Sequence, residues 1–136
     1  MSELITKSAS ELATLIESKE VSSLEVTEAF FDRAEKLNDL TLSYLHLKRD
    51  NAISAAKQAD SDLAGGKRHS ALHGVPIAVK DNLTTTDAPT TAGSKILEGW
   101  VPQYDSTVVK KIRAAGLPIL GKTNMDEFAM GSSTEY

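Results

Sequence analysis

Apolar residues recur at helical spacing in three segments of the first half of the sequence. The S-x-x-E motifs at positions 8–11 and 22–25 are capping boxes, and each predicts the start of a helix. The second helix is predicted to end near Asn38. A third helix is predicted from about Asp50 to the Gly65–Gly66 pair, and its alanine-rich face would allow close packing. The apolar stripes consist of Leu12, Leu15, Ile16, Val26, Phe30, Ala34, Leu37, Ala52, Ala55, Ala56, Ala59 and Leu63.

Short apolar runs replace the helical pattern in the second half. Thr41–Leu47 alternates in part and predicts a short strand. Leu72–Lys80 is a turn followed by an apolar run long enough for a buried strand, which Asp81–Asn82 closes as a turn. Thr84–Trp100 is rich in Thr, Gly, Ala and Pro and predicts a long loop, and loops of this length are usually functional or mobile. Leu117–Leu120 predicts another buried strand.

The remaining segments complete an α/β pattern. A helix is predicted from the cap at Asp105 or Ser106 to Gly116, and a short helical turn at 125–130. Helices alternating with continuous apolar strands indicate an α/β fold with helices packed on a partial parallel sheet. Two or three strands would leave both edges of that sheet open, so residues 1–136 are expected to be the N-terminal portion of a single larger domain. The helix beginning near residue 106 should turn Val108, Val109, Ile112 and Ala115 inward.

Composition excludes several classes of function. The net charge is −4 and the basic residues are scattered, which argues against a nucleic-acid surface. No cysteine is present, and the three histidines lack metal-ligand spacing, so we expect no metal site. No apolar run approaches a membrane span, and the N-terminus does not resemble a signal peptide. We expect no membrane contact and a cytoplasmic or organellar-matrix location.

Residues 116–123 read GLPILGKT and match the phosphate-binding pattern G-x-x-x-x-G-K-T of nucleotide hydrolases. Such a loop needs a strand before its first glycine, exposed amides and a helix N-terminus at its end. Here a predicted helix comes first, the intervening residues are apolar, and Pro118 has no amide hydrogen to donate. We therefore interpret the segment as a helix end, a buried strand and a turn at 121–123, with Lys122 exposed.

Lys80 ends an apolar strand in the segment HGVPIAVKDN, residues 73–82. Such a strand would bring the amine near the interior, where burial disfavours its charged form. A neutral amine in that position can accept a proton from a nucleophile. Because strands often end in charged residues, a plain surface role for Lys80 stays open.

Four segments together resemble the amidase signature family. They are GVPIAVKDN, TTAGSKIL, DSTVVKKIRAAGLPILGKTNMDEFAMGSSTE and the N-terminal run SELATLIESKEVSSLEVTEAFFDRAEKLN. The resemblance covers essentially the whole chain and is most specific at 74–82 and 121–135. Within the family the likeness is greatest to the glutaminase subunits of tRNA-dependent amidotransferases.

The resemblance implies an amide-bond hydrolase with a mixed α/β fold and a serine, a second serine on a cis peptide bond, and a lysine. Lys80 matches the catalytic lysine, which would accept a proton relayed through the second serine. The two serines and the oxyanion-hole amides are expected beyond Tyr136, so these 136 residues alone should be inactive. Met130, Gly131, Ser132 and Ser133 match a segment that lines the substrate pocket. Ser94 lacks a nearby glycine-flanked elbow, so we expect a loop residue there rather than a nucleophile.

The resemblance also implies the reaction partners. Glutamine would be the substrate, and the ammonia released would reach B and C partner subunits that amidate an activated Glu-tRNA(Gln). ATP and magnesium would be used by the partner subunit, and this chain itself would need no cofactor. Two alternatives stay open: a free amidase of the same family, or a non-catalytic truncated or split module that binds another chain.

Overall fold

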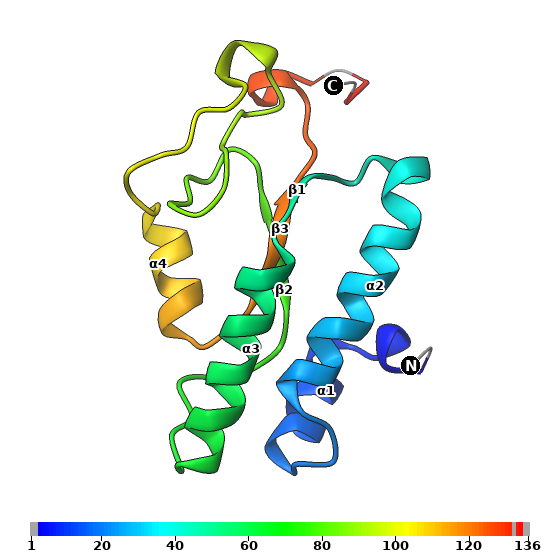
Figure 1. The fold of residues 1–136 in the computed structure, drawn as a ribbon, viewed down its shortest axis with the longest axis vertical. Helices are drawn as coiled ribbons and strands as arrows, with labels where there is room; N and C mark the ends of the chain where they lie inside the picture. The colour runs from blue at the N-terminus through cyan, green and yellow to red at the C-terminus, as the bar shows by residue number, and fades with distance from the viewer. Residues whose placement is uncertain (1–2, 132, 135–136) are drawn as a thin grey trace.

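The computed structural model describes residues 3–131, 133 and 134 (Figure 1). Its helices and strands follow the α/β order expected from the sequence. They are the α-helices α1 (Ala9–Glu17), α2 (Ser23–Thr41), α3 (Arg49–Ala64) and α4 (Thr107–Ala114), the strands β1 (Tyr44–Leu47), β2 (Ile77–Lys80) and β3 (Ile119–Thr123), and the short 3-10 helices η1 (Leu4–Thr6), η2 (Lys95–Leu97) and η3 (Glu127–Ala129).

The strands form one mixed sheet in the order β1–β3–β2. The central strand β3 pairs antiparallel with β1 and parallel with β2. Helices α2 and α3 pack together, and α3 also packs on β3. In Figure 1, α4 lies to the left of α3 and α2 to the right. The α/β fold with helices on a partial mixed sheet, as the resemblance implies, is therefore confirmed, whereas the parallel sheet predicted from the apolar strands is wrong for β1, which pairs antiparallel.

Both predicted capping boxes are present. The side chains of Ser8 and Ser22 each accept a hydrogen bond from the backbone of a glutamate three residues later, and that glutamate binds back to the serine amide. Helix α2 was predicted to end near Asn38, but it continues to Thr41. The Asn38 side chain instead binds both backbone groups of Tyr44, so it stabilises the turn that leads into β1.

Small residues allow α3 to lie close to its neighbours. Ala52, Ala56 and Ala59 are at most 3% exposed, as the alanine-rich stripe predicts. The buried Phe31 of α2 packs in one cluster with Ala52 and with Leu120 of β3. This contact connects the helical half of the chain to the sheet.

Two local predictions in the second half were wrong. The strand β3 spans Ile119–Thr123, so the expected turn at 121–123 is part of the sheet. Pairing with strands on both sides extends β3 past its apolar run, because the ladder satisfies the backbone groups of those residues. In α4, Val109 is fully buried as expected, whereas Val108 is 48% exposed.

Gly121 is required for close packing of β1 on β3. A Cβ atom at this position would lie 2.2 Å from the backbone oxygen of His46. We expect Gly121→Ala to lower the free energy of unfolding by about 2 kcal/mol or more, because backbone atoms must move. Urea unfolding measures the change.

Gly65→Ala is the matched control, because its Cβ would meet only ordinary contacts at 3.5 Å. Its unfolding midpoint should stay close to that of the unsubstituted protein. Equal midpoints for the two variants would contradict the packing argument.

Candidate active site at the carboxyl end of the parallel strands

Lys80 lies at the carboxyl end of β2, where parallel α/β sheets usually carry their functional groups. In the register with β3 it pairs with Thr123. The side chain is exposed, which differs from the expected position near the interior. Within the part of the chain that the structure describes, its amine makes no hydrogen bond or ion pair. Lys80 is therefore accessible at this edge of the sheet.

The residue that follows Lys80 forms a buried ion pair. The Asp81 carboxylate lies 3.1 Å from the Lys122 ammonium, measured from Oδ1 to Nζ, and both side chains are at most 1% exposed. The expectation that Lys122 would be exposed was therefore wrong. Lys122 pairs in register with His46 of β1 and Val79 of β2, so its side chain lies on the face of the sheet that carries the buried Val79.

A threonine-rich loop surrounds this ion pair. The Lys122 ammonium donates to Thr90 Oγ1 at 2.7 Å and to the Pro89 carbonyl at 3.3 Å. Asp81 Oδ2 accepts from the Thr91 amide at 2.9 Å and also from the Thr91 hydroxyl. The loop residues thus satisfy charges that would otherwise be buried without hydrogen bonds.

Burial controls the protonation of Lys122. Removal of its ammonium from water lowers the pKa of Lys122, and the nearby Asp81 carboxylate opposes that shift. The amine is therefore easier to deprotonate than an exposed lysine. Lys122 remains fully occupied by its partners in the loop and the strand, which distinguishes it from the accessible Lys80.

The same loop also contacts the 3-10 helix η3, which follows β3 in the sequence. Ser94 is buried, and its hydroxyl donates to the Glu127 carboxylate at 2.6 Å. The amide of Phe128 donates to the Ala92 carbonyl at 2.9 Å. Gly93 has a positive φ of 66°, and a Cβ there would lie 2.5 Å from the Met125 carbonyl. Ser94 is thus a structural loop residue in this arrangement.

Asn124 connects the end of β3 to the end of α2. Its Oδ1 accepts from the Met125 amide, and its Nδ2 donates to the Leu42 carbonyl at 3.1 Å. These contacts hold the chain where it leaves the sheet. The segment at 125–130 does contain the predicted helical turn, but the turn is limited to η3.

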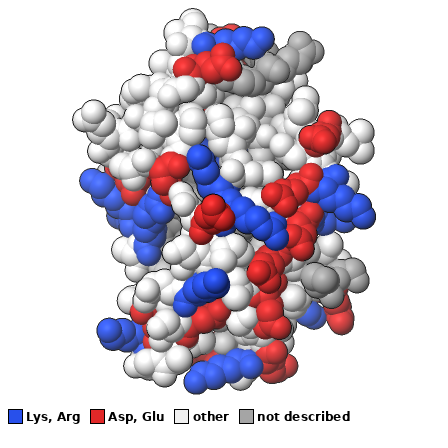
Figure 2. All heavy atoms as spheres, viewed as in Figure 1, with Lys and Arg blue, Asp and Glu red and all other residues white. Residues whose placement is uncertain are grey.

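The predicted substrate-pocket residues lie at the chain's far end. Met130, Gly131 and Ser133 are exposed, and Ser132 lies outside the described residues. Exposed apolar side chains occur in and next to η2 and η3, and Figure 2 shows a mostly uncharged band below the charged groups at the top of this face. They are Ile96, Trp100, Val101, Phe128 and Met130. The assignment of residues 130–133 to a substrate pocket stays a prediction.

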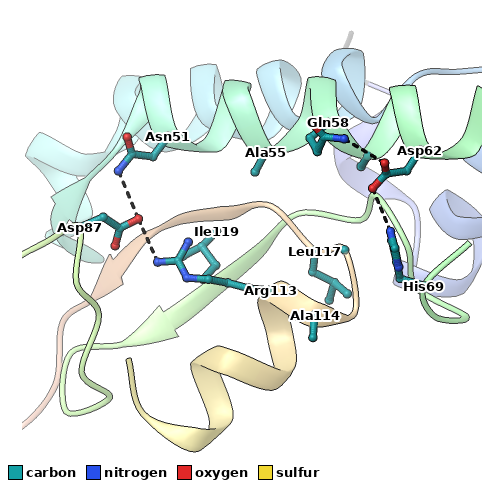
Figure 3. A pocket seen from close by; sticks show the side chains of 12 residues that line it. Asn51, Ala55, Gln58, Asp62, His69, Asp87, Arg113, Ala114, Leu117 and Ile119 are labelled. Atoms are coloured by element: carbon teal, nitrogen blue, oxygen red, sulfur yellow. Dashed lines mark hydrogen bonds and ion pairs between the residues drawn. The ribbon is translucent and has the colours of Figure 1, made fainter. Parts of the chain in front are cut away.

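A groove of about 310 Å³ lies elsewhere, between α3, α4 and β3 (Figure 3). Its polar side chains already pair with one another. Asp87 accepts from Asn51 and pairs with Arg113, while Asp62 binds Gln58 and His69. The middle of the groove is apolar. With its polar groups already paired, this groove is a weaker candidate for chemistry than the edge that carries Lys80.

The phosphate-loop pattern at 116–123 forms no phosphate cradle. Gly116 has a positive φ of 76° after the end of α4, and the residues that follow enter the sheet. Lys122, the lysine of the pattern, is buried against Asp81. Among the described residues there is no cluster of His, Cys, Asp or Glu that could hold a metal ion. None of the helices described is both long and apolar enough to cross a membrane.

The chain matches a protein-family model described as Amidase over residues 25–136. Curated relatives that are named as the A subunit of glutamyl-tRNA(Gln) amidotransferase are similar along almost the whole chain. The protein from Rhodococcus erythropolis is 58% identical over 99% of this chain, and that from Corynebacterium glutamicum is 59% identical over 98%. The chain spans 28% and 27% of their respective lengths.

Solved amidase structures share the fold. A peptide amidase from Stenotrophomonas maltophilia superposes with a TM-score of 0.85 and 30% identity, over 90% of this chain and 26% of that one. A fatty acid amide hydrolase superposes with a TM-score of 0.83 and 29% identity, over 94% of this chain and 23% of that one.

We expect His46 to make the stability of this region sensitive to pH. It pairs in register with Lys122, and its Nε2 is buried without a hydrogen-bond partner among the described residues. Desolvation lowers the pKa of His46 below 6.5, so the unfolded chain binds the proton more readily. Stability should fall as the pH falls below 6.5, and the loss is complete below the folded-state pKa.

Urea unfolding at pH 7.5 and pH 5 tests this expectation against His46→Gln, which cannot titrate. The unsubstituted protein should lose more stability between the two pH values than the variant does. Parallel losses in the two proteins would show that His46 does not contribute to the pH dependence.

Proposed function

The chain belongs to the amidase family, and on that premise we propose that it is the N-terminal part of an A subunit of glutamyl-tRNA(Gln) amidotransferase. In this proposal it contributes to a glutaminase that supplies ammonia for Gln-tRNA(Gln) formation. The relatives with 54–59% identity support this role over that of other amidases. The B and C subunits would be the partners, and tRNA would be bound through them.

One observation carries the proposal at the level of chemistry. Lys80 ends β2 with an accessible amine, while the neighbouring Asp81 and Lys122 are buried and paired. Lys80 is therefore the lysine at this edge that is free to take part in proton transfer. Its position within the family match is consistent with the catalytic lysine implied by the resemblance.

The proposed reaction is the hydrolysis of the side-chain amide of glutamine. A serine oxygen attacks the amide carbon and loses its proton through a second serine, on a cis peptide bond, to the Lys80 amine. The C–N bond then breaks, the leaving nitrogen receives a proton, and ammonia departs. Water cleaves the acyl-serine to give glutamate and regenerate the serine. By the resemblance, both serines belong to parts of the protein that these 136 residues do not span.

The amidation of Glu-tRNA(Gln) would take place on the partner subunit, which would use ATP and magnesium. This chain would need neither. The bacterial relatives support a cytoplasmic complex, with an organellar matrix as the other compartment consistent with this role. A free amidase is the second candidate, because the similar solved structures include a peptide amidase. Ammonia transfer to tRNA by the assembled complex would distinguish the two.

Lys80→Ala in the full-length protein, in complex with its partners, should reduce glutamine hydrolysis by at least about 1,000-fold, since a member of the catalytic unit is lost. Steady-state ammonia release measures the effect. Lys57→Ala, at an exposed position on α3, is the control and should retain normal turnover. Near-normal turnover by Lys80→Ala would make Lys80 structural rather than catalytic.

The isolated 136-residue chain should not hydrolyse glutamine, because the serines and the oxyanion-hole donors implied by the resemblance are not among its predicted site residues. Ammonia release by the purified chain is the measurement. Detectable hydrolysis that disappears in Lys80→Ala would show that these residues hold a complete catalytic unit, contrary to the proposal.

A further inference from the structure

We propose that the buried Asp81–Lys122 pair is a positioning unit that sets the direction of Lys80 and joins it to the loop at 89–94. This inference rests on the proposed function of Lys80. Neither Asp81 nor Lys122 would touch the substrate. Both would act through the backbone that they hold.

Strand alternation directs the Lys80 side chain to the face of the sheet opposite the ion pair. Val79 and Asp81 are buried on one side of β2, whereas Lys80 between them is exposed. The Asp81 amide donates to the Thr123 carbonyl at 3.2 Å, and the Asp81 carbonyl accepts from the Ala92 amide at 3.0 Å. The residue directly after Lys80 is thus held through both backbone groups and through its carboxylate. A shift of Asp81 would turn the Lys80 backbone with it.

The pair has a composition that stability alone does not explain. Replacement of a buried ion pair by apolar residues of similar size is often neutral or stabilising. Apolar side chains could fill this space, but they could not bind the hydroxyls of Thr90 and Thr91 or the Pro89 carbonyl. What the charges add is a fixed position of the loop relative to the two strand ends.

The loop also bonds to η3, so it connects the ion pair to that 3-10 helix. Ala92, one residue after Thr91, binds both the Asp81 carbonyl and the Phe128 amide through its own backbone groups. Ser94 then binds Glu127. The ion pair therefore connects the strand end that carries Lys80 with η3, which leads into the predicted pocket segment at 130–133.

The central experiment separates positioning from stability in the full-length protein, in complex with its partners. Asp81→Leu/Lys122→Met removes both charges together and should fold with a melting temperature near that of the unsubstituted enzyme. We expect kcat for glutamine hydrolysis to fall about 100-fold, the effect of a misplacement of about 1 Å, with KM within about threefold. A normal kcat in the double variant, together with normal stability, would overturn the proposal, because the pair would then be only structural.

Threonine variants test the same inference with a smaller change. Thr91→Val removes the hydroxyl bond to Asp81 and keeps the ion pair, and kcat should fall about tenfold, as for the loss of one such hydrogen bond. Thr85→Val is the matched control, because Thr85 is equally buried but its hydroxyl bonds, among the described residues, to the Ala88 carbonyl rather than to the ion pair. It should lose similar stability and keep its kcat. Equal kcat values for the two variants would overturn the proposal even if the double variant failed to fold.

Lys80→Ala in the same assembly distinguishes the two proposals. If that variant is inactive and Thr91→Val is normal, only the positioning role fails. If Lys80→Ala retains turnover, the proposed function of Lys80 fails first.

Discussion

The exclusion of water from the Asp81–Lys122 pair is the constraint on which this end of the molecule depends. Two opposite charges that are almost fully buried need one another and need further hydrogen bonds, because either charge left alone would be costly. The partners come from strand β3, from the turn after β2 and from the loop at 89–91. These segments are far apart in the sequence. They are consequently held in one arrangement, and the accessible Lys80 lies beside it.

Close approach of backbone is the second requirement for this arrangement. Gly121 lets β1 lie against β3, and the buried alanines of α3 let that helix lie close to the sheet. Larger side chains at either place would separate the elements. The central strand could then no longer present Lys122 to Asp81 at the distance observed. The packing of small residues and the pairing of charges therefore both determine the position of Lys122 relative to Asp81.

Features determined by neighbouring residues were predictable from the sequence, and features determined by distant ones were not. The capping serines Ser8 and Ser22 and the alanine-rich helix α3 use contacts within a few residues, so their patterns are sufficient. The end of β3 depends on pairing with strands on both sides, and Gly121 and Lys122 show little strand preference of their own. The burial of Lys122 was missed for this reason, because the sequence alone does not show the register shift that pairs this residue with Val79 and His46. Lys80 was predicted as a candidate from its apolar strand, but its exposure could not be read from that strand alone.

The order of the strands in space has a consequence for how the chain is made. The central strand β3 is the last of the three described strands along the sequence, and β1 and β2 do not pair with one another in the described sheet. During synthesis, β1 and β2 therefore leave the ribosome before the strand that joins them exists. The helices α1, α2 and α3 can form from local contacts in that interval, whereas the pairing of β1 and β2 must wait for β3. Until residue 123 has emerged, the open edges of two separate strands are available for binding by chaperones.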